Sequence, residues 1–371
     1  MVMRLRVFSM LCVVLMGSCV DRIMFDVGAP DLFPVVVEGY ISDEPGPYRV
    51  LLTKSFDIES KLSTKVPITV KELVISDSEG NSEKLSEVSS GVYQTSKNGI
   101  RGVIGRAYKL RMELLDGRKY ETIPDTLYAG GTVDSIYYSF RTDQSPDGAV
   151  QNGFDIFFNS SAGEERNYYY LWKFVGTYKV EAGPELFTEP VGESRVPRPL
   201  PCSAFAVVGG ALTQVRDCTC CTCWTSIFNQ NPIISDNQFV QDGKFRNIRG
   251  GYVPINAYTF LYKVHAEVRQ LSLSPQAFRF WKGIVDQKES NGSLFQPQSG
   301  RILSNFVQIS GPSVPVNGYF YASSVKKKSL YLTRDDIPGG VQVPDPPGRF
   351  PDTCLKLFPF STTTKPDFWV D

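Results

Sequence analysis

Short segments in which apolar and polar residues alternate constrain the fold of this chain more than any other feature. Residues 108–114 alternate strictly, and the turn dipeptide Asp116-Gly117 separates them from a second run at 119–123. Alternation with a period of two places successive side chains on opposite faces of a strand, and an Asp-Gly turn is typical of a hairpin. Similar runs occupy residues 35–41, 48–53, 66–76 and 91–95. Short strands at this spacing predict an immunoglobulin-like β-sandwich over residues 34–130.

A second group of such segments predicts another β-rich domain over residues 131–371. The runs lie at residues 135–140, 154–158, 168–180 and 258–268. In the last run the alternation places His265 on the polar face, between Lys263 and Glu267. The expected fold is therefore mainly β throughout.

One helix is predicted near residues 275–290. Ser274 is a favourable N-cap, Pro275 suits the first helical position, and Asn291-Gly292 suits the end. An apolar stripe formed by Phe278, Trp281 and Val285 gives this helix one face to bury. We expect that face to cover the second sheet.

The N-terminus resembles a lipoprotein signal peptide. Two early arginines precede an apolar stretch at residues 7–16, which is about half the length that a membrane span needs. Small residues then precede Cys19 in the sequence Leu15-Met16-Gly17-Ser18-Cys19, which is similar to a lipobox. The sequence predicts removal of residues 1–18, a lipid anchor on Cys19 and a tether over 19–33; the alternative is a plain secretory signal with Cys19 unmodified. Several acyl chains together give stable membrane anchoring.

Six further cysteines lie in the body of the chain, at Cys202, Cys218, Cys220, Cys221, Cys223 and Cys354. An exported chain meets an oxidising compartment, so we expect three disulfides, with 15 pairings open. The alternative is a soft metal held by thiolates, but zinc sites space their cysteine pairs differently. The cysteines at 202–223 belong to a proline-rich loop at 181–225, expected to be irregular. A second such loop lies at 338–352, and both are candidate contact surfaces.

Charge and motifs exclude several classes of function. The chain carries 39 basic and 39 acidic residues, so no nucleic-acid partner is expected; the one basic cluster, Lys326-Lys327-Lys328, is interpreted as a solvated turn. His265 is the one histidine and is expected on the surface, without a nucleophile elbow or a phosphate loop beside it. We therefore expect no cofactor, no metal and no catalytic site, although paired carboxylates for glycoside hydrolysis stay open.

Several blocks of the sequence together resemble a family of Bacteroidota lipoproteins catalogued as domain of unknown function 4249. The blocks lie at residues 37–41, 223–224, 271–282, 292–298, 317–325 and 365–369. The resemblance implies an outer-membrane lipoprotein encoded beside TonB-dependent receptors, on the cell surface or the periplasmic face. It carries over no catalytic residue.

Three functions follow as hypotheses. The first is an accessory binding or lid subunit that acts with a TonB-dependent nutrient transporter at the outer membrane. The second is a structural adhesion or envelope-assembly lipoprotein. The third is a glycan-active enzyme, which requires a deep cleft with two carboxylates roughly 5–10 Å apart.

Overall fold

The structure is a computed structural model in which residues 34–371 form one compact unit. It describes residues 35–370 except 55–65, 145–147, 149, 164–168, 230, 236–241, 291–301, 303, 312–313, 347 and 359. The signal peptide at 1–18, the anchor Cys19 and the tether at 19–33 lie outside the described residues, so they stay predictions. No helix within the described residues is both long and apolar enough to cross a membrane.

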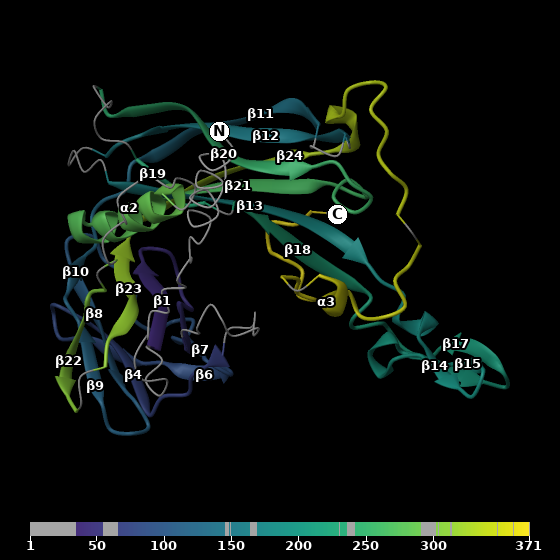
Figure 1. Cartoon of the computed structure of the whole chain (residues 1–371), viewed down its shortest axis with the longest axis horizontal. Helices are drawn as coiled ribbons and strands as arrows, with labels where there is room; N and C mark the ends of the chain where they lie inside the picture. The colour runs from purple at the N-terminus through teal and green to yellow at the C-terminus, as the bar shows by residue number, and fades with distance from the viewer. Residues whose placement is uncertain are drawn as a thin grey trace, which may run out of the picture. The chain divides into compact units, whose positions relative to one another are not determined.

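The mainly β fold is confirmed, and its first half is a sandwich of two sheets (Figure 1). The first sheet contains, in spatial order, β23 (Val316–Ser323), β1 (Val35–Ser42), β2 (Arg49–Lys54), β7 (Val92–Gln94) and β6 (Ser86–Ser89), with β3 (Val66–Pro67) paired to β2. The second contains β22 (Phe306–Ser310), β9 (Lys119–Thr122), β8 (Ala107–Glu113), β4 (Glu72–Asp77) and β5 (Ser82–Lys84), with β10 (Asp125–Thr126) paired to β8. Inward-facing aliphatic and tyrosine side chains of both sheets form one buried core.

Two strands of this sandwich come from the C-terminal half of the chain. β23 pairs in parallel with β1, from Val35 opposite Val316 to Ser42 opposite Ser323, and β22 pairs with β9. The sandwich expected over residues 34–130 is therefore not a contiguous segment. The expected boundary near residue 130 falls after β10, where the chain leaves the sandwich. The chain returns to the sandwich at β22.

The second half contains another pair of sheets. One consists of β11 (Thr132–Gln144), β12 (Val150–Ser161) and β20 (Lys244–Pro254). The other consists of β18 (Thr222–Phe228), β13 (Tyr170–Glu181), β21 (Val264–Ser272) and β24 (Val325–Leu332), with β19 (Ile233–Ile234) paired to β13. Alternating aromatic residues of β13, Trp172 and Phe174 among them, form the core of this half, as the alternation predicts. Tyr168 lies outside the described residues.

The strand predicted over residues 258–268 is wrong in its first part, because β21 begins only at Val264. The side chain of Asn256 accepts the backbone N–H groups of Tyr258 (2.9 Å) and Thr259 (3.0 Å). The Thr259 hydroxyl donates to the carbonyl of Pro254 at 2.6 Å. Such local bonds compete with the hydrogen bonds of a strand ladder. The first part of the alternating run therefore lies in a turn that precedes β21.

The lysine cluster at 326–328 is not a solvated turn, because all three residues lie in β24. Lys326 pairs with Asp43 at 3.3 Å and Lys327 with Glu44 at 2.9 Å. The Lys328 ammonium donates to a backbone carbonyl. These partners come from residues far away in sequence, which a charge run alone does not reveal.

The predicted helix is confirmed as α2 (Pro275–Ser290). The Ser274 hydroxyl accepts the Ala277 N–H at 3.0 Å, as an N-cap does. Its apolar face packs on β13 and β19 as expected, but also on β23 of the sandwich, so the helix lies between the two halves (Figure 1). Asn291-Gly292 lies outside the described residues.

The loop at 181–225 is more regular than expected. It contains the 3₁₀ turns η1 (Pro184–Leu186) and η2 (Pro201–Ser203) and two hairpins, β14 (Thr188–Val191) with β15 (Ser194–Pro197) and β16 (Phe205–Val208) with β17 (Ala211–Gln214). The segment at 338–352 contains no strand within its described residues; η3 (Arg334–Asp336) precedes it and the short helix α3 (Cys354–Leu357) follows it.

A buried carboxylate, Asp125, joins the sandwich to the helix and gives the fold a pH dependence. The Ser274 hydroxyl donates to one carboxylate oxygen, and the Ala322 N–H donates to the other at 3.0 Å. Burial raises the pKa of Asp125 to about 6, against the opposing effect of the Ser274 and Ala322 hydrogen bonds. The folded carboxyl therefore keeps its proton to a higher pH than the unfolded one, which releases it near 3.8.

Removing this carboxylate should change the pH profile of stability. Because the folded state binds more protons between pH 4 and 6, Asp125 lowers the unfolding free energy as pH rises through that window, by about 2–3 kcal/mol. Urea unfolding of the wild type and Asp125→Asn at pH 4 to 7 should show the variant gaining relative stability with pH. Parallel profiles for the two proteins would contradict this assignment.

Candidate functional site

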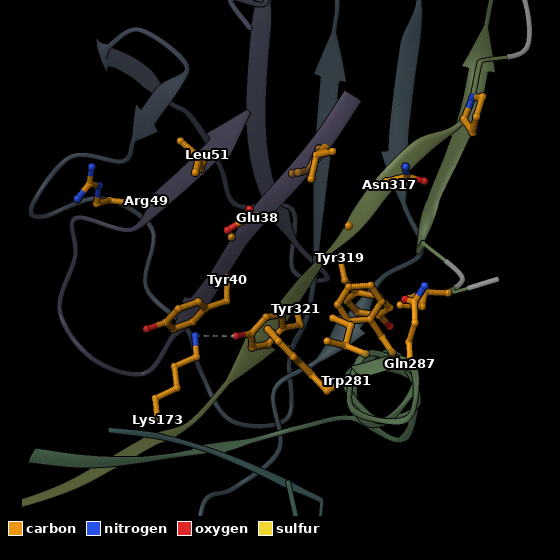
Figure 2. A pocket seen from close by; sticks show the side chains of 18 of the residues that line it. Glu38, Tyr40, Arg49, Leu51, Lys173, Trp281, Gln287, Asn317, Tyr319 and Tyr321 are labelled. Carbon is orange, nitrogen blue, oxygen red and sulfur yellow. Dashed lines mark hydrogen bonds between the residues drawn. The ribbon is translucent and has the colours of Figure 1, made fainter. Parts of the chain in front are cut away.

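A cavity of about 1450 Å³ lies between the outer face of the first sheet and helix α2 (Figure 2). One wall consists of β1, β2, β7 and β23, whose outward side chains alternate with those in the sandwich core. The other wall consists of α2 and one residue of β13. The residues used below are Glu38, Tyr40, Arg49, Lys173, Phe280, Trp281, Lys288, Tyr319 and Tyr321.

Aromatic rings cover the floor of the cavity. Tyr40 of β1 stacks on Tyr321 of β23 with ring centroids 5.3 Å apart and planes 15° apart. Trp281 of α2 meets Tyr321 edge-on at 6.2 Å, and Phe280 lies 5.1 Å from Tyr319. These rings come from three elements that are far apart in sequence. Tyr319 and Tyr321 are buried, whereas Tyr40, Phe280 and Trp281 are partly exposed and offer ring surfaces on which another ring can pack.

Lys173 reaches into this aromatic floor from β13. Figure 2 shows its amine directed toward the Tyr321 hydroxyl, at 3.5 Å. The amine also lies 5.1 Å from the centroid of Tyr40 and 5.9 Å from that of Trp281, within range of cation–π attraction. Within the described residues, no carboxylate lies at ion-pair distance from it. Burial, and then the nearby charge of Arg269, lower the pKa of Lys173 to about 8, while Glu38 opposes this effect.

The tyrosines of the cavity are held in their neutral form. Burial raises the pKa of Tyr321 well above its usual value, and the charges of Tyr40 and Asp125 act in the same direction. Burial raises the pKa of Tyr319 and Tyr40 as well. These phenols are therefore protonated at neutral pH, so the charge of the cavity comes from its lysines, Arg49 and Glu38.

The lining is more basic than the chain as a whole. Arg49, Lys173 and Lys288 supply three positive charges against the one carboxylate of Glu38, which gives a net charge of +2 among the described lining residues. The complete chain is neutral, with 39 charges of each sign. The cavity is therefore suited to an apolar ring that carries negative charge.

The six predicted disulfide cysteines are joined in three pairs, away from this cavity. The pairs are Cys202–Cys220, Cys218–Cys221 and Cys223–Cys354, with Cα atoms 5.6, 5.7 and 5.9 Å apart. The first two lie at the base of the hairpins, where the Thr219 N–H donates to the Cys202 carbonyl at 2.9 Å. The third ties β18 to α3 near the C-terminus. In the described part of the chain, no group of His, Cys, Asp and Glu is arranged to hold a metal.

His265 is not a surface residue, because its exposed fraction is only 3%. Its ring stacks on Phe368 with centroids 4.1 Å apart, and Tyr331 lies 5.1 Å away. Phe368 of the C-terminal segment covers this polar face of the sheet that contains β21, and burial lowers the pKa of His265. A small cavity of about 220 Å³ beside it is lined by the ion pair of Glu267 and Arg269.

Reasoning from sequence missed the large cavity. Its aromatic residues lie in the blocks at 37–41, 271–282 and 317–325, which carry the family resemblance. Those blocks were the sequence signal that could have indicated the position of the cavity. Lys173 was hidden on the less apolar face of the 168–180 alternation.

Comparison with known proteins finds one family. Residues 26–329 match the family model described as Domain of unknown function (DUF4249). The search of curated proteins finds no match to this chain.

Proposed function

The chain belongs to the family described as Domain of unknown function (DUF4249), and from that premise we propose that it is a lipid-anchored ligand-binding subunit of a TonB-dependent nutrient transporter at the outer membrane. The observation that carries the binding role is the cavity of about 1450 Å³ with its aromatic floor. The anchor and the transporter rest on the lipobox-like sequence at Cys19 and on the resemblance.

The cavity favours binding over catalysis. Its volume exceeds that of a typical small-molecule site, about 300–1000 Å³, and suits a ligand of several rings. Hydrolysis of a glycoside needs two carboxylates on either side of the bond. Among the described lining residues the one carboxylate is Glu38.

The partner is tested by purifying the full-length lipidated protein from native membranes. We expect a TonB-dependent transporter in the purified material, and Cys19→Ala should lose both membrane attachment and the transporter. Mass spectrometry of the mature N-terminus checks that Cys19 carries acyl chains. Recovery of the acylated protein with no transporter would overturn the proposal.

A second candidate function is envelope assembly or adhesion, and the β16–β17 hairpin favours it. Residues 203–215 carry no charge, and Val207 and Val208 at the tip are 52% and 57% exposed. Uncharged exposed strands with open edges tend to meet a protein partner. A deletion strain that grows normally on every nutrient but assembles a defective surface would support this candidate.

A further inference from the structure

We propose that the cavity binds a ring compound that carries a carboxylate, and that this carboxylate pairs with the ammonium of Lys173. The inference rests on the proposed function, because it takes the cavity as the ligand site. It adds the chemical class of the ligand and the residue that selects it. Three observations carry it: an ammonium that pairs with no described anion, an indole N–H that donates to no described acceptor, and ring surfaces beside both.

Lys173 differs from a comparable lysine on the same strand. Lys179, six residues further along β13, also lies over a ring, at 4.3 Å from the Tyr262 centroid, but it pairs with Glu181 at 3.3 Å. Lys173 also lies beside rings, but no carboxylate of the described residues pairs with it. Since a buried ammonium is costly unless an anion pairs with it, Lys173 has the environment of a cation that awaits a ligand.

The charged residues around Lys173 indicate that a ligand would bring one negative charge to the cavity. Arg269 of β21 is already paired with Glu267, and Arg49 is exposed to solvent. Glu38 is the carboxylate of β1 whose charge acts on Lys173, but it lies beyond ion-pair distance from the ammonium. Tyr40 and Tyr321 are neutral, so the ammonium is the charge that needs an anion. A single carboxylate meets that need.

Trp281 carries a donor without a described partner. Its indole N–H is buried and donates to no acceptor in the described residues, and the side chain lines the cavity beside Lys173, whose amine lies 5.9 Å from the ring centroid. A carboxylate paired with Lys173 has oxygens enough for one further donor. The planes of Tyr40 and Trp281 are then available to pack against the ring that carries the carboxylate.

Isothermal titration of residues 34–371, the compact unit without the lipid anchor, tests this inference with two carboxylate probes and their neutral partners. The probes are an oligogalacturonate with the uncharged galactose oligomer of equal length, and benzoate with benzamide. We expect at least one carboxylate to bind tenfold or more tightly than its neutral partner. Which pair responds distinguishes an acidic sugar from an aryl acid as the source of the carboxylate.

Variants connect this preference to Lys173. Lys173→Met should weaken carboxylate binding by tenfold or more, whereas the control Lys179→Met should leave it unchanged. Binding should also weaken as pH rises through about 8, where the Lys173 ammonium loses its proton. Trp281→Phe should weaken it less than Lys173→Met does.

The outcomes separate this inference from the proposed function. Equal binding of charged and neutral probes, or carboxylate binding that survives Lys173→Met, would overturn the inference and leave the cavity as a ligand site. Absence of binding by all four probes would overturn the inference as well, while recovery of a transporter from membranes would still support the proposed function.

Discussion

Replacing Cys223 and Cys354 together by serine is expected to lower the free energy of unfolding by about 3–5 kcal/mol, the largest loss among the three disulfides. A disulfide stabilises chiefly by restricting the unfolded chain, and this effect grows with the length of chain that it closes. The Cys223–Cys354 bridge joins residues 131 apart, whereas Cys218–Cys221 joins residues three apart. Both cysteines of the long bridge are fully buried, so two serine hydroxyls would also lose hydration.

The paired variant Cys218→Ser with Cys221→Ser is the matched control. It removes the same chemical bond but closes only a short loop, so its loss should be much smaller. Urea unfolding of both double variants and the wild type measures the difference through the midpoint and slope. Equal losses would mean that local geometry at the hairpin base, rather than chain restriction, sets the contribution of these bonds.

The same bridges bear on the cellular compartment. Six paired cysteines are typical of a protein that folds in an oxidising environment. This agrees with the export signal that the first residues predict. A fully reduced sample should be less stable than the Cys223→Ser, Cys354→Ser variant, because it also loses the Cys202–Cys220 bridge between residues 18 apart.

Local sequence signals predicted those elements whose determinants are themselves local. Helix α2 begins at the residue that Ser274 and Pro275 indicate, because an N-cap and a fixed backbone angle act within one turn. The aromatic alternation of β13 likewise reports burial on one face. By contrast, the turn at Tyr258 depends on Asn256, a polar residue outside the alternating run.

Long-range packing could not be read from the sequence. The parallel pairing of β23 with β1 joins residues about 280 positions apart, and no periodicity encodes the partner of a strand. His265 looked polar and exposed because its own strand alternates, yet Phe368 covers it. The cavity could not be predicted either, since Tyr40, Lys173 and Trp281 come from β1, β13 and α2, which are distant in sequence.

Lys173→Met is expected to raise the free energy of unfolding at pH 7 by about 1–3 kcal/mol. Burial holds the pKa of Lys173 near 8 in the folded protein, against 10.5 for an ordinary lysine. Between these values the unfolded chain binds more protons than the folded one, so the wild type gains stability as pH rises from 8 to 10.5. Methionine removes the charge, so its advantage should be largest below pH 8 and shrink above it.

The measurement compares urea unfolding of both proteins at pH 7 and pH 10, with Lys179→Met as the control. Lys179 has a carboxylate partner, so its replacement should cost stability slightly, by less than about 1 kcal/mol. A Lys173→Met protein less stable than the wild type at pH 7 would mean that the aromatic rings alone compensate the buried charge.

A gain in stability combined with a loss of carboxylate binding would identify Lys173 as a residue kept for function. Folding alone favours an apolar side chain among Tyr40, Trp281 and Tyr321, because an unpaired ammonium there is desolvated. Residues that weaken the free protein and strengthen its complex mark binding sites in many proteins. Binding of the carboxylate would then stabilise the wild type by pairing with the ammonium. We expect the ligand to raise the Tm of the wild type but not that of Lys173→Met.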